Sequence, residues 1–150
     1  MSPVPDTAVT PTGDRHVICM KWGTKYGPEY VNRLYAMVRR HLSGPFNFVC
    51  LTDDAVGIRP EVQCLPIPAL DLPAGIPERG WTKLATFSAG LHGLQGTALC
   101  LDVDVVITGS LDGFFTQPGE FLIIHDYKRP WRITGNSSVY RFQLGAHPDV

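Results

Sequence analysis

The stretch ALCLDVD, residues 98–104, decides the fold that we predict from this sequence. It begins as an apolar run typical of a fully buried strand and turns polar at Asp102 and Asp104. Strands that are apolar throughout belong to parallel sheets covered on both faces. Ligands of such sheets bind beyond the carboxyl ends of the strands, which is where we expect these two carboxylates to lie.

Strand and helix patterns alternate on both sides of this stretch. Apolar strand patterns occur at residues 16–21, 46–51, 62–67, 121–124 and 139–144, amphipathic helix patterns at 28–42 and 81–94, and a short helix pattern at 110–115. The segment 66–80 contains four prolines and is predicted to be a loop. This alternation predicts an α/β fold with a mixed, mostly parallel sheet and a long helix on each face.

Composition narrows the class of protein. The 13 Lys and Arg nearly balance the 14 Asp and Glu, so no basic excess favours nucleic-acid binding. Residues 1–15 contain three prolines and no apolar run, which predicts a disordered leader before one domain at residues 16–150. No segment has the length and apolar character of a transmembrane helix. The four cysteines lie within apolar runs and form no CxxC pair, which favours reduced thiols in a cytoplasmic protein.

The two carboxylates after the buried strand predict a metal site. Carboxylate oxygens select hard divalent cations such as Mg²⁺ or Mn²⁺. Because Asp also favours turns, the alternative is that Asp102 caps a turn and Asp104 is solvated.

The sequence resembles the A-type (GT-A) glycosyltransferases that carry a DxD motif, in particular the bacterial relatives of the lipopolysaccharide and glycogenin-like group. LCLDVDVVITGSLDGFF (99–115) is similar to that family's metal-binding strand and the short helix after it. GWTKLATF (80–87) is similar to its helix with a basic residue, and GNSSVYRF (135–142) to its segment beside the donor sugar. With VICMKWGTKYGPEYVNRLY (17–35) and FVCLTDD (48–54), the resemblance extends from residue 16 to about residue 147.

The resemblance implies a Rossmann-like nucleotide-diphospho-sugar transferase fold. It implies transfer of a sugar from a nucleotide diphosphate donor, with uridine diphosphate sugars favoured, to an acceptor that the sequence does not identify. Asp102 and Asp104 would hold Mn²⁺ or Mg²⁺. The donor-binding residues that it implies are Lys21, Trp22, Gly23, Asp53, Lys83, Asn136 and Ser137. No catalytic residue is predicted.

Some of these residues also have plain structural interpretations. Lys83 could be a solvated lysine on a helix, Trp22 could pack in the core, and Asp53 could cap a turn. Asn136 likewise suits a turn by its conformational preferences.

The resembled family takes a further metal ligand and much of its acceptor site from a segment beyond the one that this sequence reaches. We therefore expect a donor-binding domain that is truncated at its C-terminus, and we expect the 150-residue chain to transfer sugar poorly or not at all by itself. Around Tyr140, Phe142 and Leu144 we expect exposed apolar surface that favours self-association.

Two other functions fit the same motif. In a haloacid-dehalogenase-like phosphatase Asp102 would be the nucleophile and Asp104 the acid/base, although that motif normally lies on the first strand. The other possible function is that of a non-catalytic fragment that binds a nucleotide.

Overall fold

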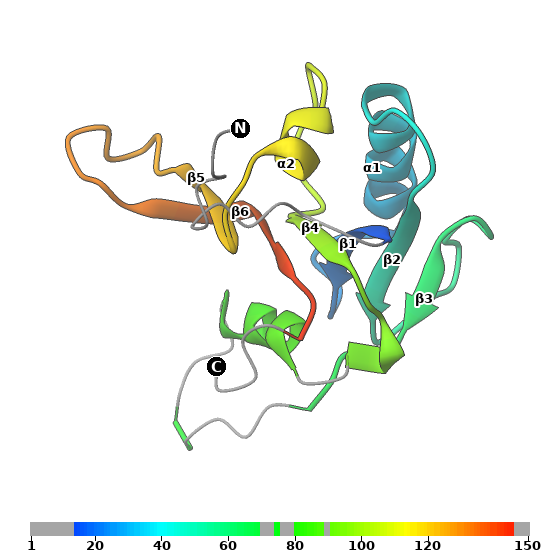
Figure 1. Ribbon diagram of the computed structural model, residues 1–150. Coiled ribbons are helices and arrows are strands. Elements are labelled where there is room, and N and C mark those ends of the chain that lie inside the picture. The colour runs from blue at the N-terminus through cyan, green and yellow to red at the C-terminus, as the bar shows by residue number, and fades with distance from the viewer. Residues whose placement is uncertain (1–13, 70–73, 76–79, 89–90, 146–150) are drawn as a thin grey trace.

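A six-stranded sheet forms the centre of the protein in the computed structural model, which describes residues 14–69, 74–75, 80–88 and 91–145 (Figure 1). The strands are β1 (Arg15–Lys21), β2 (Asn47–Thr52), β3 (Gln63–Leu65), β4 (Thr97–Leu101), β5 (Phe121–His125) and β6 (Gly135–Gln143). Their order across the sheet is β3-β2-β1-β4-β6-β5. The first four strands run parallel, and β6 pairs antiparallel with both β4 and β5. The predicted α/β class with a mixed, mostly parallel sheet is therefore confirmed.

The central strands are buried almost throughout because both faces of the sheet are covered. On one face Val17 and Cys19 pack under helix α1 (Pro28–His41) and helix α2 (Asp112–Thr116). On the other face Ile18 and Met20 lie in a second core with residues of the 3-10 helix η1 (Gly80–Phe87). The predicted coverage of both faces is confirmed, and it explains why these strands are apolar at every position.

Helix α1 follows from its sequence pattern. Pro28 at its start suits the fixed backbone of a first helical turn, and the basic residues Arg39, Arg40 and His41 face the negative end of the helix dipole. Its apolar stripe is fully buried and consists of Val31, Leu34 and Val38. The predicted helix at residues 28–42 therefore agrees with the structure to within one residue.

The predicted amphipathic helix at residues 81–94 is wrong in kind. The chain instead forms η1 and a second short 3-10 helix, η2 (Leu91–Gly93). His92 and Gly93 have φ angles of 45° and 74°, in the left-handed region, where an α-helix cannot continue. In a 3-10 helix, side chains three residues apart lie above one another, so Lys83 and Thr86 emerge on the same side of η1.

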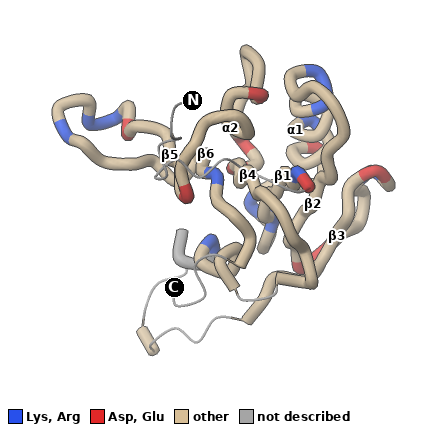
Figure 2. Tube along the Cα trace, in the orientation of Figure 1, with Lys and Arg blue, Asp and Glu red and all other residues tan. Residues whose placement is uncertain are grey.

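The remaining predictions concern the ends and loops. Residues 1–13 of the predicted leader lie outside the described residues, whereas Arg15, which was assigned to that leader, begins β1. Much of the predicted loop at 66–80 also lies outside them, and the third strand is shorter than predicted. Within the described residues, no helix is long and apolar enough to cross a membrane. Acidic and basic residues are interspersed along the described trace (Figure 2).

The expected exposed surface on β6 is not found where it was predicted. Tyr140 and Phe142 are only 4% and 1% exposed. The ring of Phe87 in η1 covers them, with its centroid 5.8 Å from that of Tyr140 and 4.4 Å from that of Phe142. Within the described residues, the exposed large apolar side chains are instead Phe121 and Ile123 of β5 and five residues in loops, which are Val56, Val106, Tyr127, Trp131 and Ile133.

Candidate functional site

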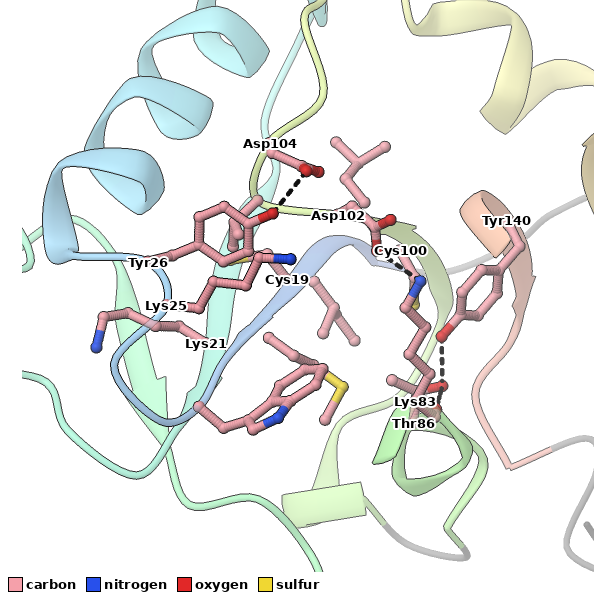
Figure 3. A pocket seen from close by; sticks show the side chains of 15 residues that line it. Cys19, Lys21, Lys25, Tyr26, Lys83, Thr86, Cys100, Asp102, Asp104 and Tyr140 are labelled. Carbon is pink, nitrogen blue, oxygen red and sulfur yellow. Dashed lines mark hydrogen bonds and ion pairs between the residues drawn. The ribbon is translucent and has the colours of Figure 1, made fainter. Parts of the chain in front are cut away.

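A cavity of about 430 Å³ opens at the carboxyl ends of the parallel strands β1 and β4 (Figure 3). The loop after β1, the turn after β4, helix η1 and Tyr140 of β6 complete its wall. Of the residues predicted for donor and metal binding, the cavity is lined by Lys21, Trp22, Lys83, Asp102 and Asp104. These residues come from three separate segments, so the fold brings together side chains that are up to 83 positions apart in the sequence (Lys21 to Asp104).

Asp102 is held in place by the strand next to it and by a lysine. Its backbone N–H donates to the carbonyl of Ser138 at 3.0 Å, which continues the pairing of β4 with β6. Lys83 Nζ lies 2.6 Å from Asp102 Oδ1. The same ammonium group donates to the carbonyl and to the hydroxyl of Ser137 at 3.1 and 3.2 Å. Its three hydrogens are thereby used, and Lys83 fixes the orientation of the Asp102 carboxylate.

Asp104 is hydrogen-bonded to Tyr26, a residue of the loop after β1 that also lines the cavity. Residues 102–105 form a turn in which Val105 N–H donates to the Asp102 carbonyl at 3.3 Å. Val103 between the two carboxylates is buried in the core, which anchors the turn. Tyr26 donates its hydroxyl to Asp104 Oδ2 at 2.8 Å, and this bond raises the pKa of Tyr26. The two carboxylates therefore lie in a turn after β4 and flank the cavity (Figure 3).

The loop after β1 brings Trp22 and Tyr26 to the cavity. Lys21 is buried at the end of the strand, and its Nζ lies 3.4 Å from the carbonyl of Asp54. Gly23 has a φ of 67°, which an L side chain rarely adopts, and its N–H donates to Asp53 Oδ2 at 2.9 Å. Asp53 thus ties the loop after β1 to the end of β2, and it does not line the cavity.

Asn136 and Ser137, which were predicted to bind the donor, lie at the start of β6, where the pairing of β6 with β5 is irregular. Pairing with β5 shifts by three residues between Ile123, opposite Tyr140, and Ile124, opposite Asn136. Asn136 accepts from Ser138 N–H at 3.0 Å, so its amide shapes this irregularity. Ser137 reaches Lys83, whereas Asn136 does not line the cavity.

Among the lining residues that were not predicted from the sequence, four carry a hydroxyl or ammonium group. They are Lys25, Tyr26, Thr86 and Tyr140. Tyr140 and Thr86 share a hydrogen bond of 3.0 Å between their hydroxyl groups. Burial strongly raises the pKa of Tyr140 and raises that of Cys100, also in the wall, to about 12. This part of the wall is therefore neutral at physiological pH and supplies no anionic nucleophile.

The donor set suits a hard divalent ion that keeps part of its hydration shell. Asp102 and Asp104 offer carboxylate oxygens, the ligands that Mg²⁺ and Mn²⁺ prefer. Within the described residues, they are not part of any group of three Asp, Glu, His or Cys side chains able to hold an ion. The remaining ligands would be water and oxygens of a bound phosphate, which is how Mg²⁺ is commonly held.

Comparison with known proteins assigns no family to this chain. No family model matches it, and no curated protein matches it in sequence.

Proposed function

We propose that the cavity binds a nucleoside diphosphate sugar and that the protein is a metal-dependent glycosyltransferase. One observation carries the proposal: two carboxylates and several lysines surround a single cavity at the carboxyl ends of parallel strands. In α/β sheets this edge is where ligands bind. A diphosphate between a divalent cation and Lys25 would be neutralised from both sides.

Each part of the cavity suits one part of such a ligand. Asp102 and Asp104 would hold Mn²⁺ or Mg²⁺, and Lys83 would keep the Asp102 carboxylate oriented while its other oxygen stays available. A divalent ion bound there supplies Lewis-acid stabilisation of the departing diphosphate. Trp22 and Tyr26 offer aromatic surface for a base. Uridine is the favoured base because the chain resembles a family that mostly uses it.

Asn136 and Ser137, the residues predicted nearest the sugar, lie at the start of β6. Ser137 lies within hydrogen-bond distance of Lys83, which itself contacts Asp102. A sugar attached to a metal-bound diphosphate would therefore extend toward the start of β6. Asn136 would act through the backbone geometry that it imposes on Ser137 and Ser138.

A thermal-shift screen of nucleotides, with and without Mn²⁺, tests the proposal. A ligand at 100 times its dissociation constant adds about 2.7 kcal/mol of stability, or about 5–11 °C in Tm for a chain of this size. We expect uridine diphosphate with Mn²⁺ to give a larger shift than either component alone. A larger shift with purine nucleotides, or a shift independent of metal, would contradict the proposal.

The same preparation separates the two alternatives. A haloacid-dehalogenase-like phosphatase would release phosphate from p-nitrophenyl phosphate with Mg²⁺ and lose that activity in Asp102→Asn. A non-catalytic nucleotide-binding fragment would bind uridine diphosphate and leave uridine diphosphate sugars intact, even when an acceptor is supplied or the chain is extended.

A further inference from the structure

A second hollow of about 350 Å³ adjoins the cavity. We call it the aromatic groove: it lies between helix η1 and the β5–β6 hairpin and is lined mainly by Phe87, Phe121, Ile123 and Tyr140, with Lys83 and Ser137 at one end. Lys83 and Tyr140 also line the cavity at the ends of β1 and β4. The two hollows therefore meet at the side chain that orients Asp102.

The pairing of β5 with β6 builds the apolar part of this groove. Phe121 lies opposite Phe142, and Ile123 lies opposite Tyr140, so all four side chains project from the same face of the sheet. Phe87 and Tyr140 lie within one stack of rings, with centroids 5.8 Å apart. Phe121 and Ile123 on the outer strand are 41% and 40% exposed. The sheet thus presents an aromatic floor with an accessible outer edge.

The irregularity in the hairpin turns the polar end of the groove toward the cavity. Between Asn136 and Tyr140, three residues of β6 have no partner on β5, and Ser137 is one of them. A Cβ atom on Gly135 would lie only 2.8 Å from two side-chain carbons of Ile123, so a larger residue there would displace the Ile123 side chain. Ser137 accepts a hydrogen bond from Lys83, which leaves its own hydroxyl hydrogen to be donated.

The groove is therefore amphiphilic along its length. Its end at the cavity carries an ammonium group and a hydroxyl, whereas the rest carries aromatic and aliphatic carbon. Sites for small molecules are commonly concave, mostly apolar and provided with a few convergent polar groups. A ligand that matches this pattern has a hydroxyl-bearing head and an apolar ring or chain.

We propose that the aromatic groove binds the acceptor of the transfer reaction, a glycoside or similar hydroxyl compound with an apolar aglycone. This proposal rests on the proposed function of the neighbouring cavity. The acceptor head would lie at Ser137 and Lys83, next to the donor sugar, and its apolar portion would lie on Phe121 and Ile123, beside Phe87.

Transfer then joins the contents of the two hollows. The acceptor oxygen forms a bond to the anomeric carbon of the donor sugar, and the bond from that carbon to the diphosphate oxygen breaks. The electron pair of the broken bond remains on the nucleoside diphosphate, and the hydroxyl proton passes to the diphosphate or to water. No further reactant is required.

The test uses phenyl β-D-glucoside and phenyl β-D-galactoside as probes. Glucose and galactose, which lack the phenyl group, are the reference ligands. Binding is measured by titration NMR on the 150-residue chain, in the presence of uridine diphosphate and Mn²⁺. We expect at least one phenyl glycoside to bind more tightly than its free sugar. Ile123→Ser should weaken that binding about tenfold, which is the scale for removing a small apolar contact from a pocket.

Ile133→Ser is the matched control, because Ile133 is fully exposed, at 103%, on the loop between β5 and β6 and does not line the groove. It should leave glycoside binding unchanged. Phe121→Ala is a second groove variant, and the Tm of each variant shows whether it is folded. Uridine diphosphate binding should be the same in all three variants and the wild type.

Four results would overturn the proposal. In the first, folded Ile123→Ser binds the phenyl glycoside as tightly as the wild type does; in the second, phenyl glycosides and free sugars bind with equal affinity. In the third, the glycoside competes with uridine diphosphate. In the fourth, Ile123→Ser loses self-association while its glycoside binding is unchanged. The last would identify the groove as a contact between copies of the chain. Failure of uridine diphosphate to bind the wild type would instead contradict the proposed function, and it is measured separately.

Discussion

The ion pair between Lys83 and Asp102 links helix η1 to the turn after β4, and a double-mutant cycle measures how strongly it holds them together. The Lys83 and Asp102 side chains are 21% and 32% exposed, and Nζ lies 2.6 Å from Oδ1. Fully exposed pairs contribute about 0.2–1 kcal/mol, whereas removing one partner of a buried pair costs about 3–5 kcal/mol. For this partly exposed pair we expect a coupling energy of about 1 kcal/mol. Lys83→Met should cost about 1–2 kcal/mol, because the Ser137 carbonyl also loses its donor.

Urea unfolding of the wild type, Lys83→Met, Asp102→Asn and the double variant gives the cycle. The single variants should lower the midpoint with little change in the m-value, since the fold is kept. The double variant should be more stable than the sum of the two single effects predicts. A coupling energy within about 0.3–0.5 kcal/mol of zero is indistinguishable from additivity and would refute the view that Lys83 positions Asp102.

Three further predictions concern stability and reactivity. Leu34 is fully buried in helix α1, so Leu34→Ala should cost about 2–5 kcal/mol in urea unfolding; a smaller loss would contradict the packing of that helix. A hydrogen bond from the Ser43 N–H lowers the pKa of Asp112. The wild type should therefore be more stable than Asp112→Asn above about pH 4, the ordinary pKa of Asp, and this advantage should shrink as pH falls through the lowered pKa. An advantage that grows with acid would contradict this contact. A thiol reagent should modify one cysteine readily in the native chain, the half-buried Cys64, and the three buried cysteines only after denaturation; a fast phase that survives Cys64→Ser would be inconsistent with that burial.

Much of the fold could be predicted because the central strands contain runs of consecutive apolar residues. A run such as residues 17–20 has no polar side to turn toward water, so it requires cover on both faces, and the structure supplies it. The helix pattern at 81–94 misled because its apolar spacing also fits a 3-10 conformation. The left-handed backbone at His92 and Gly93 ends helical structure there, and periodicity alone does not report backbone angles of this kind.

The site could be predicted only in part. Asp102 and Asp104 line the cavity at the end of β4, as their position after a predicted strand implies, whereas Lys83, which contacts Asp102, was indicated only by the family resemblance. Tyr26 and Tyr140 could not be found in the same way, because a loop conformation and a strand register bring them to the cavity. Ser137 reaches Lys83 through a three-residue irregularity in the pairing of β5 with β6, for which Gly135 is the one sequence signal.

Calorimetric titration of uridine diphosphate, with and without Mn²⁺, into the wild type and Asp104→Asn tests the central claim most directly. Glu120→Gln is the control, since it removes an exposed negative charge from a residue that does not line the cavity. We expect Mn²⁺ to strengthen binding to the wild type and to Glu120→Gln, and we expect this metal-dependent gain to be lost in Asp104→Asn, because phosphate oxygens and both carboxylates complete the coordination of the ion. Undiminished metal-dependent binding of uridine diphosphate by Asp104→Asn would contradict the assignment of this cavity as a donor site.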